Sequence, residues 1–204
     1  MADVSGCELI SWHEVYRLCR KLSERIITSG YRPDLIVAVA RGGYVPARLL
    51  CDFIGINELT SIRVEHYYPG AKKQTEARIR DPLSADIAGR RVLLVDDVND
   101  SGDTFRVAVP YLQSFQPAEL RTAVAHSKTV SDFAEDYCGK RILKWRWIIY
   151  PWAVVEDLGA FMQAMSPKPA TAEEAQKRLL ECHGVRVKRE TLEHIFAFRA
   201  DVAS

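Results

Sequence analysis

The chain has 204 residues and a nearly balanced charge, with 28 lysines and arginines against 27 aspartates and glutamates. Hydrophobic residues make up 48% of it, which is enough for a folded core and too much for a disordered chain. Proteins that bind nucleic acid over a broad surface usually carry a basic excess, so the net charge of +1 argues against that class. We therefore expect a compact globular protein.

The cysteines and the N-terminus bear on the cellular compartment. The five cysteines are odd in number and widely spaced, which favours reduced thiols over a disulfide framework. The N-terminus reaches acidic residues before any long apolar stretch, unlike a signal peptide. No apolar run approaches the roughly 18 residues that a membrane span needs. We expect a cytoplasmic protein that does not bind membranes.

Up to about residue 150, strand patterns alternate with helix patterns. Uninterrupted apolar runs are typical of strands covered on both faces, and amphipathic stretches are typical of the covering helices. The strands are predicted at 35–40, 60–66, 91–95, 120–125 and 145–150. The helices are predicted from the Ser11 cap to Gly30, at 45–54, and at 103–115, where Pro110 should kink the helix or delay its start. This alternation predicts an α/β fold with an open, mainly parallel sheet flanked by helices.

The C-terminal part has only helical patterns. Residues 165–170 are typical of a linker, and Thr171 with Glu174 has the spacing of a capping box before two amphipathic helices. We therefore predict a main domain at 1–164 and, at 165–204, a linker with a small C-terminal helical hairpin. A DNA-reading helix-turn-helix has a similar outline, but six basic and six acidic side chains cancel here, so nucleic acid is not the expected partner.

The segment Val92–Thr104 is the most informative part of the chain. An apolar strand leads to two adjacent acids, Asp96 and Asp97, then to a loop of small residues and a helix start. Each part by itself is more often a cap or a surface turn. Together, the carboxylates suit the vicinal hydroxyls of a sugar, and the loop's backbone donors with the helix N-terminus suit a phosphate dianion. A ribose 5-phosphate carries both groups, so the combination predicts a ligand of that class.

This segment resembles the signature of the type I phosphoribosyltransferases, in which an apolar strand, two acids and a phosphate loop follow one another. The sequence departs from the family pattern at Asn99, usually apolar, and at Asp103, an extra anion beside the phosphate. Asp100 followed by Ser-Gly-x-Thr is similar to the 6-oxopurine branch, and the resemblance covers about residues 10–157. It implies transfer of the 5-phosphoribosyl group from phosphoribosyl pyrophosphate (PRPP) to a 6-oxopurine, which yields a nucleoside monophosphate and pyrophosphate in purine salvage.

The resemblance assigns the sugar and phosphate groups of PRPP to particular residues. Asp96 and Asp97 would hold the ribose and Mg²⁺, the metal mostly through water and substrate oxygens. The 5′-phosphate loop would consist of Asp100, Ser101, Gly102, Asp103 and Thr104. The pyrophosphate loop would consist of Arg41, Gly42 and Gly43, where glycine lets the backbone approach an anion closely. Asp103 must point away from the ligand, because its charge would otherwise oppose phosphate binding.

The resemblance also assigns the purine site. Asp100 matches the proton acceptor at purine N7, although it could instead cap the following helix. Lys128 matches the lysine that donates to the exocyclic O6. Trp147 and Ile148 resemble the pair that covers the base in bacterial xanthine-guanine enzymes, with core packing as the alternative. Trp145 lies on the opposite side of the same predicted strand, so one of the two tryptophans would face the pocket.

The segment from Tyr67 to Asp81 is polar and without a period, so we expect a long loop there. It matches the mobile lid of the family, which closes over pyrophosphate; the alternative is an ordinary solvated loop. The lid residues singled out are Tyr67, Tyr68, Lys72 and Lys73, and Arg78 and Arg80 could add positive charge.

A second hypothesis is a non-catalytic regulator that senses PRPP and has a helix-turn-helix-like tail. Such a sensor needs the sugar-phosphate site but no base site. Asp100, Lys128 and the aromatic residues near 147 therefore favour the enzyme. The resemblance also implies a homodimer or a higher homo-oligomer.

Overall fold

The computed structural model describes residues 6–67 and 76–202. The chain forms two compact units, one of His13–Trp145 and one of Met1–Trp12 together with Arg146–Ser204. The predicted domain boundary between residues 164 and 165 remains a prediction.

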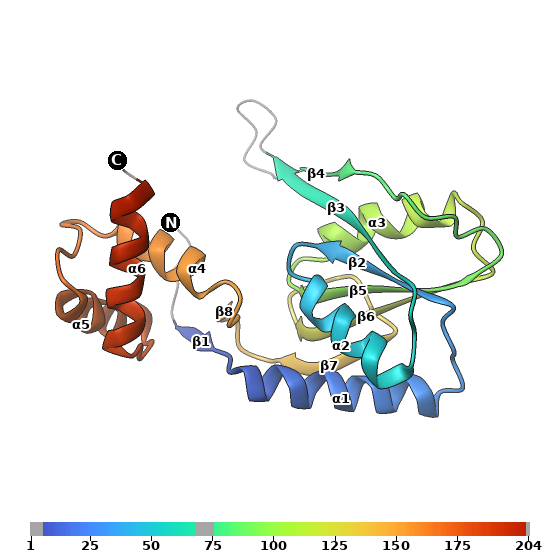
Figure 1. Cartoon of the computed structure of the whole chain (residues 1–204), viewed down its shortest axis with the longest axis horizontal. Coiled ribbons are helices and arrows are strands. Elements are labelled where there is room, and N and C mark those ends of the chain that lie inside the picture. The colour runs from blue at the N-terminus through green and yellow to red at the C-terminus, as the bar shows by residue number, and fades with distance from the viewer. Residues whose placement is uncertain (1–5, 68–75, 203–204) are drawn as a thin grey trace. The chain divides into compact units, whose positions relative to one another are not determined.

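The larger unit is built on a six-stranded sheet in the order β4-β3-β2-β5-β6-β7. Its strands are β2 (Leu35–Ala40), β3 (Leu59–Tyr67), β4 (Glu76–Asp81), β5 (Arg91–Asn99), β6 (Glu119–Lys128) and β7 (Tyr137–Ile142). All neighbouring strands run parallel except β3 and β4, which are antiparallel (Figure 1). The predicted open, mainly parallel α/β sheet is therefore confirmed.

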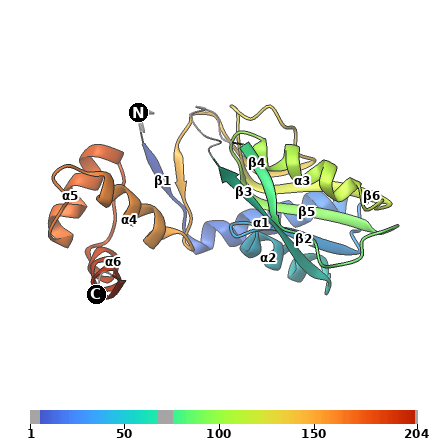
Figure 2. The same ribbon diagram turned by 90° about the horizontal axis from the view of Figure 1, so that it is seen from above.

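Helices cover both faces of this sheet. Helices α1 (Trp12–Thr28) and α2 (Tyr44–Ile54) lie on one face, and α3 (Asp103–Gln113) lies on the other (Figure 2). Alternate residues of β2 divide between the two cores: Ile36 and Ala38 pack with α1 and α2, whereas Val37 packs with α3. Because both faces are buried, the strand is apolar throughout instead of alternating.

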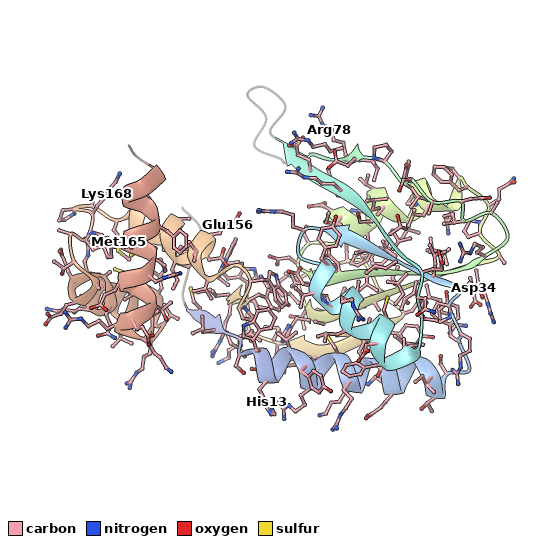
Figure 3. The ribbon with its side chains drawn as sticks, viewed as in Figure 1. His13, Asp34, Arg78, Glu156, Met165 and Lys168 are labelled. Atoms are coloured by element: carbon pink, nitrogen blue, oxygen red, sulfur yellow. The ribbon has the colours of Figure 1, made fainter. Side chains whose placement is uncertain are left out.

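The smaller unit joins the two ends of the chain. Strand β1 (Cys7–Leu9) pairs in parallel with β8 (Trp147–Ile149). The helices that follow are α4 (Val154–Ala164), α5 (Ala172–His183) and α6 (Arg189–Val202). As predicted, the Thr171 hydroxyl caps α5 by accepting from the Glu174 N–H at 3.2 Å. The linker with Met165 and Lys168 connects α4 to this hairpin (Figure 3).

The expected loop at 67–81 is wrong at Tyr67, which is the last residue of β3, and for residues 76–81, which form β4 against β3. Its polar, charged residues gave no strand pattern, and the strand is stabilised across the pair: Arg78 and Arg80 form ion pairs with Glu65, at 3.2 and 2.7 Å. Ile79 packs on the α3 side of the core. Residues 68–75 lie outside the described residues, as do Tyr68, Lys72 and Lys73 of the predicted lid.

Other differences concern strand ends and short strands. The strand predicted at 91–95 extends to Asn99, and the one predicted at 120–125 extends to Lys128. The strand predicted at 145–150 is limited to β8, so Trp145 precedes it. Strands β1 and β7 were not predicted, because β1 has three residues and β7 mixes Gly and charged residues with apolar ones. Helix α3 begins at Asp103, so the delayed start is wrong, and Pro110 lies inside the helix, where it removes one backbone N–H from the hydrogen-bond ladder.

Among the described residues, no helix combines the length and the apolar composition that crossing a membrane requires.

Candidate active site

Three neighbouring strands bring the two predicted phosphate-binding loops and Lys128 to one edge of the sheet. Arg41–Gly43 follows β2, Asp100–Gly102 follows β5, and Lys128 ends β6. These strands are parallel and adjacent in the order β2-β5-β6, so their carboxyl ends lie side by side (Figure 1). After β2 the chain crosses to β3 on one side of this pair of strands, and after β5 it crosses to β6 on the other side. Open α/β sheets bind ligands at such a switch point.

A cavity of about 630 Å³ lies at this edge, a typical size for a small-molecule site. Its lining consists of the segment Asp96–Phe105 together with Val130 and Trp145. The acidic turn that the sequence singled out therefore forms most of one wall.

Asp96 and Asp97 form a carboxylate pair at the end of β5. Asp96 is buried, and the Asp97 backbone N–H donates to its Oδ1 at 2.8 Å. Burial, followed by the charge of Asp97, raises the pKa of Asp96 well above its usual value. Each carboxylate disfavours ionisation of the other, so a cation or hydroxyl donors at this position would stabilise the charged pair.

Gly42 and Gly43 are required by close packing. A Cβ at Gly42 would overlap the Asp97 carboxylate, and a Cβ at Gly43 would overlap the Val95 and Val39 carbonyls. The loop after β2 therefore touches the acid pair of β5. The Gly43 N–H donates to the Val39 carbonyl at 2.9 Å, so in this conformation it is not available to an anion. The absence of a side chain at Gly43 is what lets the loop pack here. Arg41 is exposed, and the Ala40–Arg41 peptide is cis.

The loop after β5 turns at Gly102, which has φ +87° and directly precedes α3 as its N-cap. The interpretation of Asp100 as this cap is therefore wrong. A Cβ at Gly102 would lie 2.9 Å from atoms of Arg106, Asp132 and Phe133, so no larger residue fits without displacement. The first residues of α3, Asp103 to Phe105, line the cavity, and a helix N-terminus at such a place suits a phosphate.

The extra anion Asp103 has a partner that the sequence did not reveal. Arg106, one turn further along α3, forms ion pairs with both Asp103 and Asp132. The Ser101 hydroxyl also donates to Asp103 at 2.6 Å. The charge of Asp103 is thereby compensated by Arg106, which weakens its opposition to a phosphate in the loop.

Asn99, the other departure from the family pattern, is 1% exposed and braces the loop from behind. Its amide donates to the Phe133 carbonyl at 2.9 Å and to the Glu135 carboxylate at 2.8 Å, and its oxygen accepts from Ser131 at 2.8 Å. Phe133 also stacks on Phe105 of α3, with ring centroids 5.0 Å apart. The segment Ser131–Glu135 is thus attached at several points to the loop that lines the cavity.

Lys128 and Asp100 form an ion pair of 2.8 Å at the cavity. The lysine side chain is 3% exposed and the aspartate side chain is 42% exposed, so Asp100 faces the open cavity. The Lys128 ammonium also lies 4.6 Å from the centre of the Trp145 ring, in a cation–π contact. The charge of the buried ammonium is therefore compensated by the Asp100 carboxylate and by the Trp145 ring.

Trp145 lines the cavity although the predicted site did not include it. The predicted strand 145–150 had placed it opposite Trp147, whereas it precedes β8 and contacts Lys128. A signal was available in its neighbours, because a tryptophan between Lys144 and Arg146 is an aromatic in a charged stretch.

Trp147 and Ile148 belong to β8, in the smaller unit. The Trp147 indole N–H donates to the Asp157 carboxylate, and its ring meets Phe161 edge-on at 6.1 Å. Its side chain is 38% exposed, whereas Ile148 is buried. Their role in binding a base remains a prediction.

A sheet of this topology, with an acid pair and two glycine-containing loops at its carboxyl edge, defines an α/β protein that binds a phosphorylated sugar or nucleotide. The model of the phosphoribosyl transferase domain family matches residues 7–157, and the chain belongs to that family.

Two enzymes and one solved structure show the similarity. A xanthine-guanine phosphoribosyltransferase of Ruegeria sp. (strain TM1040) is 29% identical over 153 residues, 70% of this chain and 83% of that protein. A hypoxanthine-guanine phosphoribosyltransferase of Saccharomyces cerevisiae is 31% identical over 123 residues, 52% of this chain and 55% of that protein. The crystal structure of a purine phosphoribosyltransferase from Pyrococcus horikoshii Ot3 has a TM-score of 0.63 and 31% identity, covering 71% of this chain and 92% of that one.

Proposed function

We propose that the protein is a purine phosphoribosyltransferase, which transfers the 5-phosphoribosyl group of PRPP to a 6-oxopurine base in purine salvage. The observation that carries this proposal is that Asp100, which lines the same cavity as the acid pair, forms an ion pair with the buried Lys128. A protein that merely sensed PRPP would need the sugar-phosphate groups but no buried ammonium beside them. The similarity to purine enzymes supports the same conclusion.

PRPP would bind along the loops of the sheet edge. Asp96 and Asp97 would accept hydrogen bonds from the ribose hydroxyls, and residues 100–104 would hold the 5′-phosphate. Arg41 and the Gly42–Gly43 loop would receive the pyrophosphate, with Arg41 supplying fixed positive charge. The close packing of Gly42 against the Asp97 carboxylate supports this arrangement, because it places the proposed pyrophosphate loop directly beside the acids proposed to bind the ribose.

The acid pair also suits Mg²⁺. Asp96 and Asp97 supply the hard carboxylate oxygens that Mg²⁺ prefers. Burial, followed by the charge of Asp97, raises the pKa of Asp96, and a bound cation would favour the charged form of the pair. Within the described residues, no group of three or more Asp, Glu, His or Cys could form a complete cage, so substrate oxygens and water would complete the coordination. Bound there, Mg²⁺ would neutralise charge on the departing pyrophosphate.

The reaction would replace the bond between the anomeric carbon and pyrophosphate with a bond to purine N9. Asp100 would accept the proton at purine N7, which makes the base a better nucleophile. Lys128 would donate to O6, favouring a 6-oxopurine over adenine, whose amino group is a donor at that position. Asp100 accepts from Lys128 with Oδ2, and a carboxylate has a second oxygen for the purine proton.

Further roles belong to the same proposal. Trp147 and Ile148 would contact the base, and Tyr67, Tyr68, Lys72 and Lys73 would belong to the lid. We also propose a cytoplasmic location and a homodimer or larger homo-oligomer.

The test is to incubate the purified protein with PRPP, Mg²⁺ and, separately, hypoxanthine, guanine, xanthine and adenine, and to separate the products chromatographically. We expect nucleoside monophosphate and an equal amount of pyrophosphate with at least one 6-oxopurine, and far less with adenine. Tight PRPP binding without product from any base would favour the PRPP-sensing regulator instead.

A further inference from the structure

The pairing of β6 with β7 brings Trp145 to the end of β6. The two strands are parallel, and Lys128 lies opposite Ile142 at their carboxyl ends. Thr129 extends the pairing beyond β6, because its N–H donates to the Ile142 carbonyl at 3.2 Å and its hydroxyl donates to the Leu143 carbonyl at 3.3 Å. Two residues further on, Trp145 contacts Lys128, and both residues belong to the larger unit.

Trp145 contacts the lysine and also borders the cavity. The Lys128 ammonium lies 4.6 Å from the centre of the indole ring, within the range of a cation–π interaction. The tryptophan also lines the cavity, whose wall consists mainly of the segment Asp96–Phe105. One side chain therefore connects the buried ammonium with the space in which a ligand would bind.

The carboxylate of Asp100 is a weak constraint on the position of this ammonium. Lysine has a flexible stem, so a single partner leaves its charged end several orientations. The Asp100 side chain is 42% exposed, and in the proposed reaction it accepts the purine proton and loses its charge. The Trp145 ring attracts a cation before and after that transfer, and a tryptophan side chain has few torsions. Trp145 is therefore the partner that can hold Lys128 throughout the reaction.

We propose that Trp145 is a positioning residue, which fixes the Lys128 ammonium for the purine O6 and so favours a 6-oxopurine over adenine. The proposal rests on the proposed function, because it takes Lys128 as the donor to O6. It requires no residue of the smaller unit, since Trp145, Lys128 and Asp100 all belong to the larger one. Its effect should concern the base and not PRPP, because Trp145 acts on the lysine and not on the acid pair.

The test compares Trp145→Leu with Trp145→Phe in the full-length protein, by steady-state kinetics with PRPP, adenine and the 6-oxopurine that the wild type uses best. We expect Trp145→Leu to raise the KM for the 6-oxopurine about 3- to 10-fold, the range that loss of one cation–π contact would produce. The ratio of kcat/KM for the 6-oxopurine to that for adenine should fall, and the KM for PRPP should stay within about twofold. Trp145→Phe keeps a ring face and should retain most of the wild-type base binding.

Phe115→Leu is the matched control, because it also removes an aromatic ring from the larger unit. Phe115 is exposed and pairs with Tyr111 at 5.2 Å, and it follows the C-terminal end of α3, whereas the cavity is lined by the N-terminal end. This control should leave both KM values and the base preference unchanged. A Trp145→Leu variant that behaves like the control, or that raises the KM for PRPP as much as the KM for the base, would overturn the proposal.

Coupling to Lys128 separates positioning from direct contact with the base. If Trp145 acts through Lys128, adding Trp145→Leu to Lys128→Met should raise the KM for the 6-oxopurine no further than Lys128→Met does by itself. Additive effects in the double variant would overturn the proposal, because they would show that Trp145 acts independently of the lysine.

Failure of the proposed function would be seen separately, in the wild type. A wild-type protein that binds PRPP but forms no nucleotide, and that binds neither 6-oxopurines nor their nucleoside monophosphates in calorimetry, would overturn both proposals. An active wild type whose base binding and base preference are unchanged by Trp145→Leu would overturn the role of Trp145 but leave the proposed function intact.

Discussion

Lys128 is buried at the candidate site, and two neighbouring groups compensate its charge. Asp100 supplies a carboxylate at 2.8 Å and Trp145 the face of its ring at 4.6 Å. A buried charge without such partners would be strongly destabilising. Burying the Lys128 ammonium costs free energy of folding. Its presence beside the cavity therefore supports a role in binding the ligand.

Replacing Lys128 with methionine tests the proposed contact with O6. Methionine keeps most of the volume but removes the charge and the donor. We expect a KM for guanine raised at least tenfold, weaker discrimination against adenine, and a KM for PRPP within about threefold of the wild type. Steady-state kinetics with each base would measure this, and unchanged guanine kinetics would remove Lys128 from the base site.

Replacing Asp100 with asparagine tests proton acceptance. Asparagine can still accept from Lys128 but cannot take a proton from the purine, so kcat should fall by about 10²–10⁴. PRPP affinity, measured by calorimetry, should change little. The control is Asp52→Asn, which removes an exposed acid on α2. Equal losses in kcat and PRPP affinity would show that Asp100 supports the loop instead.

At the scale of elements, the site depends on how the loop after β5 is supported. Asn99 fixes the segment Ser131–Glu135, and Arg106 connects Asp103 to Asp132. Two departures from the family pattern, Asn99 and Asp103, thus have local explanations in the structure. Both belong to contacts that hold the loop in shape.

Gly102→Ala should damage this loop. The substitution introduces a side chain at φ +87° and places its Cβ 2.9 Å from three neighbouring groups. We expect the KM for PRPP to rise at least tenfold and the free energy of unfolding to fall by about 1–3 kcal/mol. Gly89→Ala is the control: its φ is +68°, but no atom lies within 4 Å of the added Cβ. It should lower stability and leave the KM for PRPP unchanged; equal effects of both variants on the KM would contradict the role of the loop.

At the scale of the whole molecule, each unit has a separate core. One lies on both faces of the six-stranded sheet, and the other joins β1, β8 and the C-terminal helices. The proposed PRPP residues belong to the larger unit, and Trp147 and Ile148 belong to the smaller one. Stability of the smaller unit can therefore be tested by substitutions that leave the PRPP loops untouched.

Asp157 makes that stability pH-dependent. Burial raises the pKa of Asp157 to about 6, against the opposing effect of its bond from Trp147. The folded protein therefore binds this proton more tightly than the unfolded chain, and the stabilisation by protonated Asp157 is lost as pH rises through about 6. Asp157→Asn keeps an acceptor for Trp147 without the buried charge. We expect the variant to be more stable than the wild type at pH 8, by about 1–2 kcal/mol because solvent screens this half-buried group, and about equally stable near pH 4.

Urea unfolding at both pH values, followed by tryptophan fluorescence, would measure this difference. A variant that is less stable than the wild type at pH 8 would show that the Asp157 carboxylate, as an anion, is needed for the fold.

The sequence by itself determined the parts of the protein that depend on residues close together in the chain. Apolar runs predicted β2, β5 and β6, and the motifs at their ends predicted Asp96, Asp97 and the Gly42–Gly43 loop as site residues, which the fold brings to one edge of the sheet. This succeeds because parallel strands present their carboxyl ends together. The short β1 and the polar β4 and β7 carried no such pattern, so they were missed or taken for loop.

The tertiary structure decided which distant residues support the site. Trp145 beside Lys128 and Glu135 beside Asn99 are pairs separated by 17 and 36 residues in the chain. Their roles come from contacts made when separate elements pack, and no local pattern encodes which side chains will meet. Periodicity and short motifs are set by neighbouring residues, whereas compensation of a buried charge or the stacking of two rings depends on the folded arrangement.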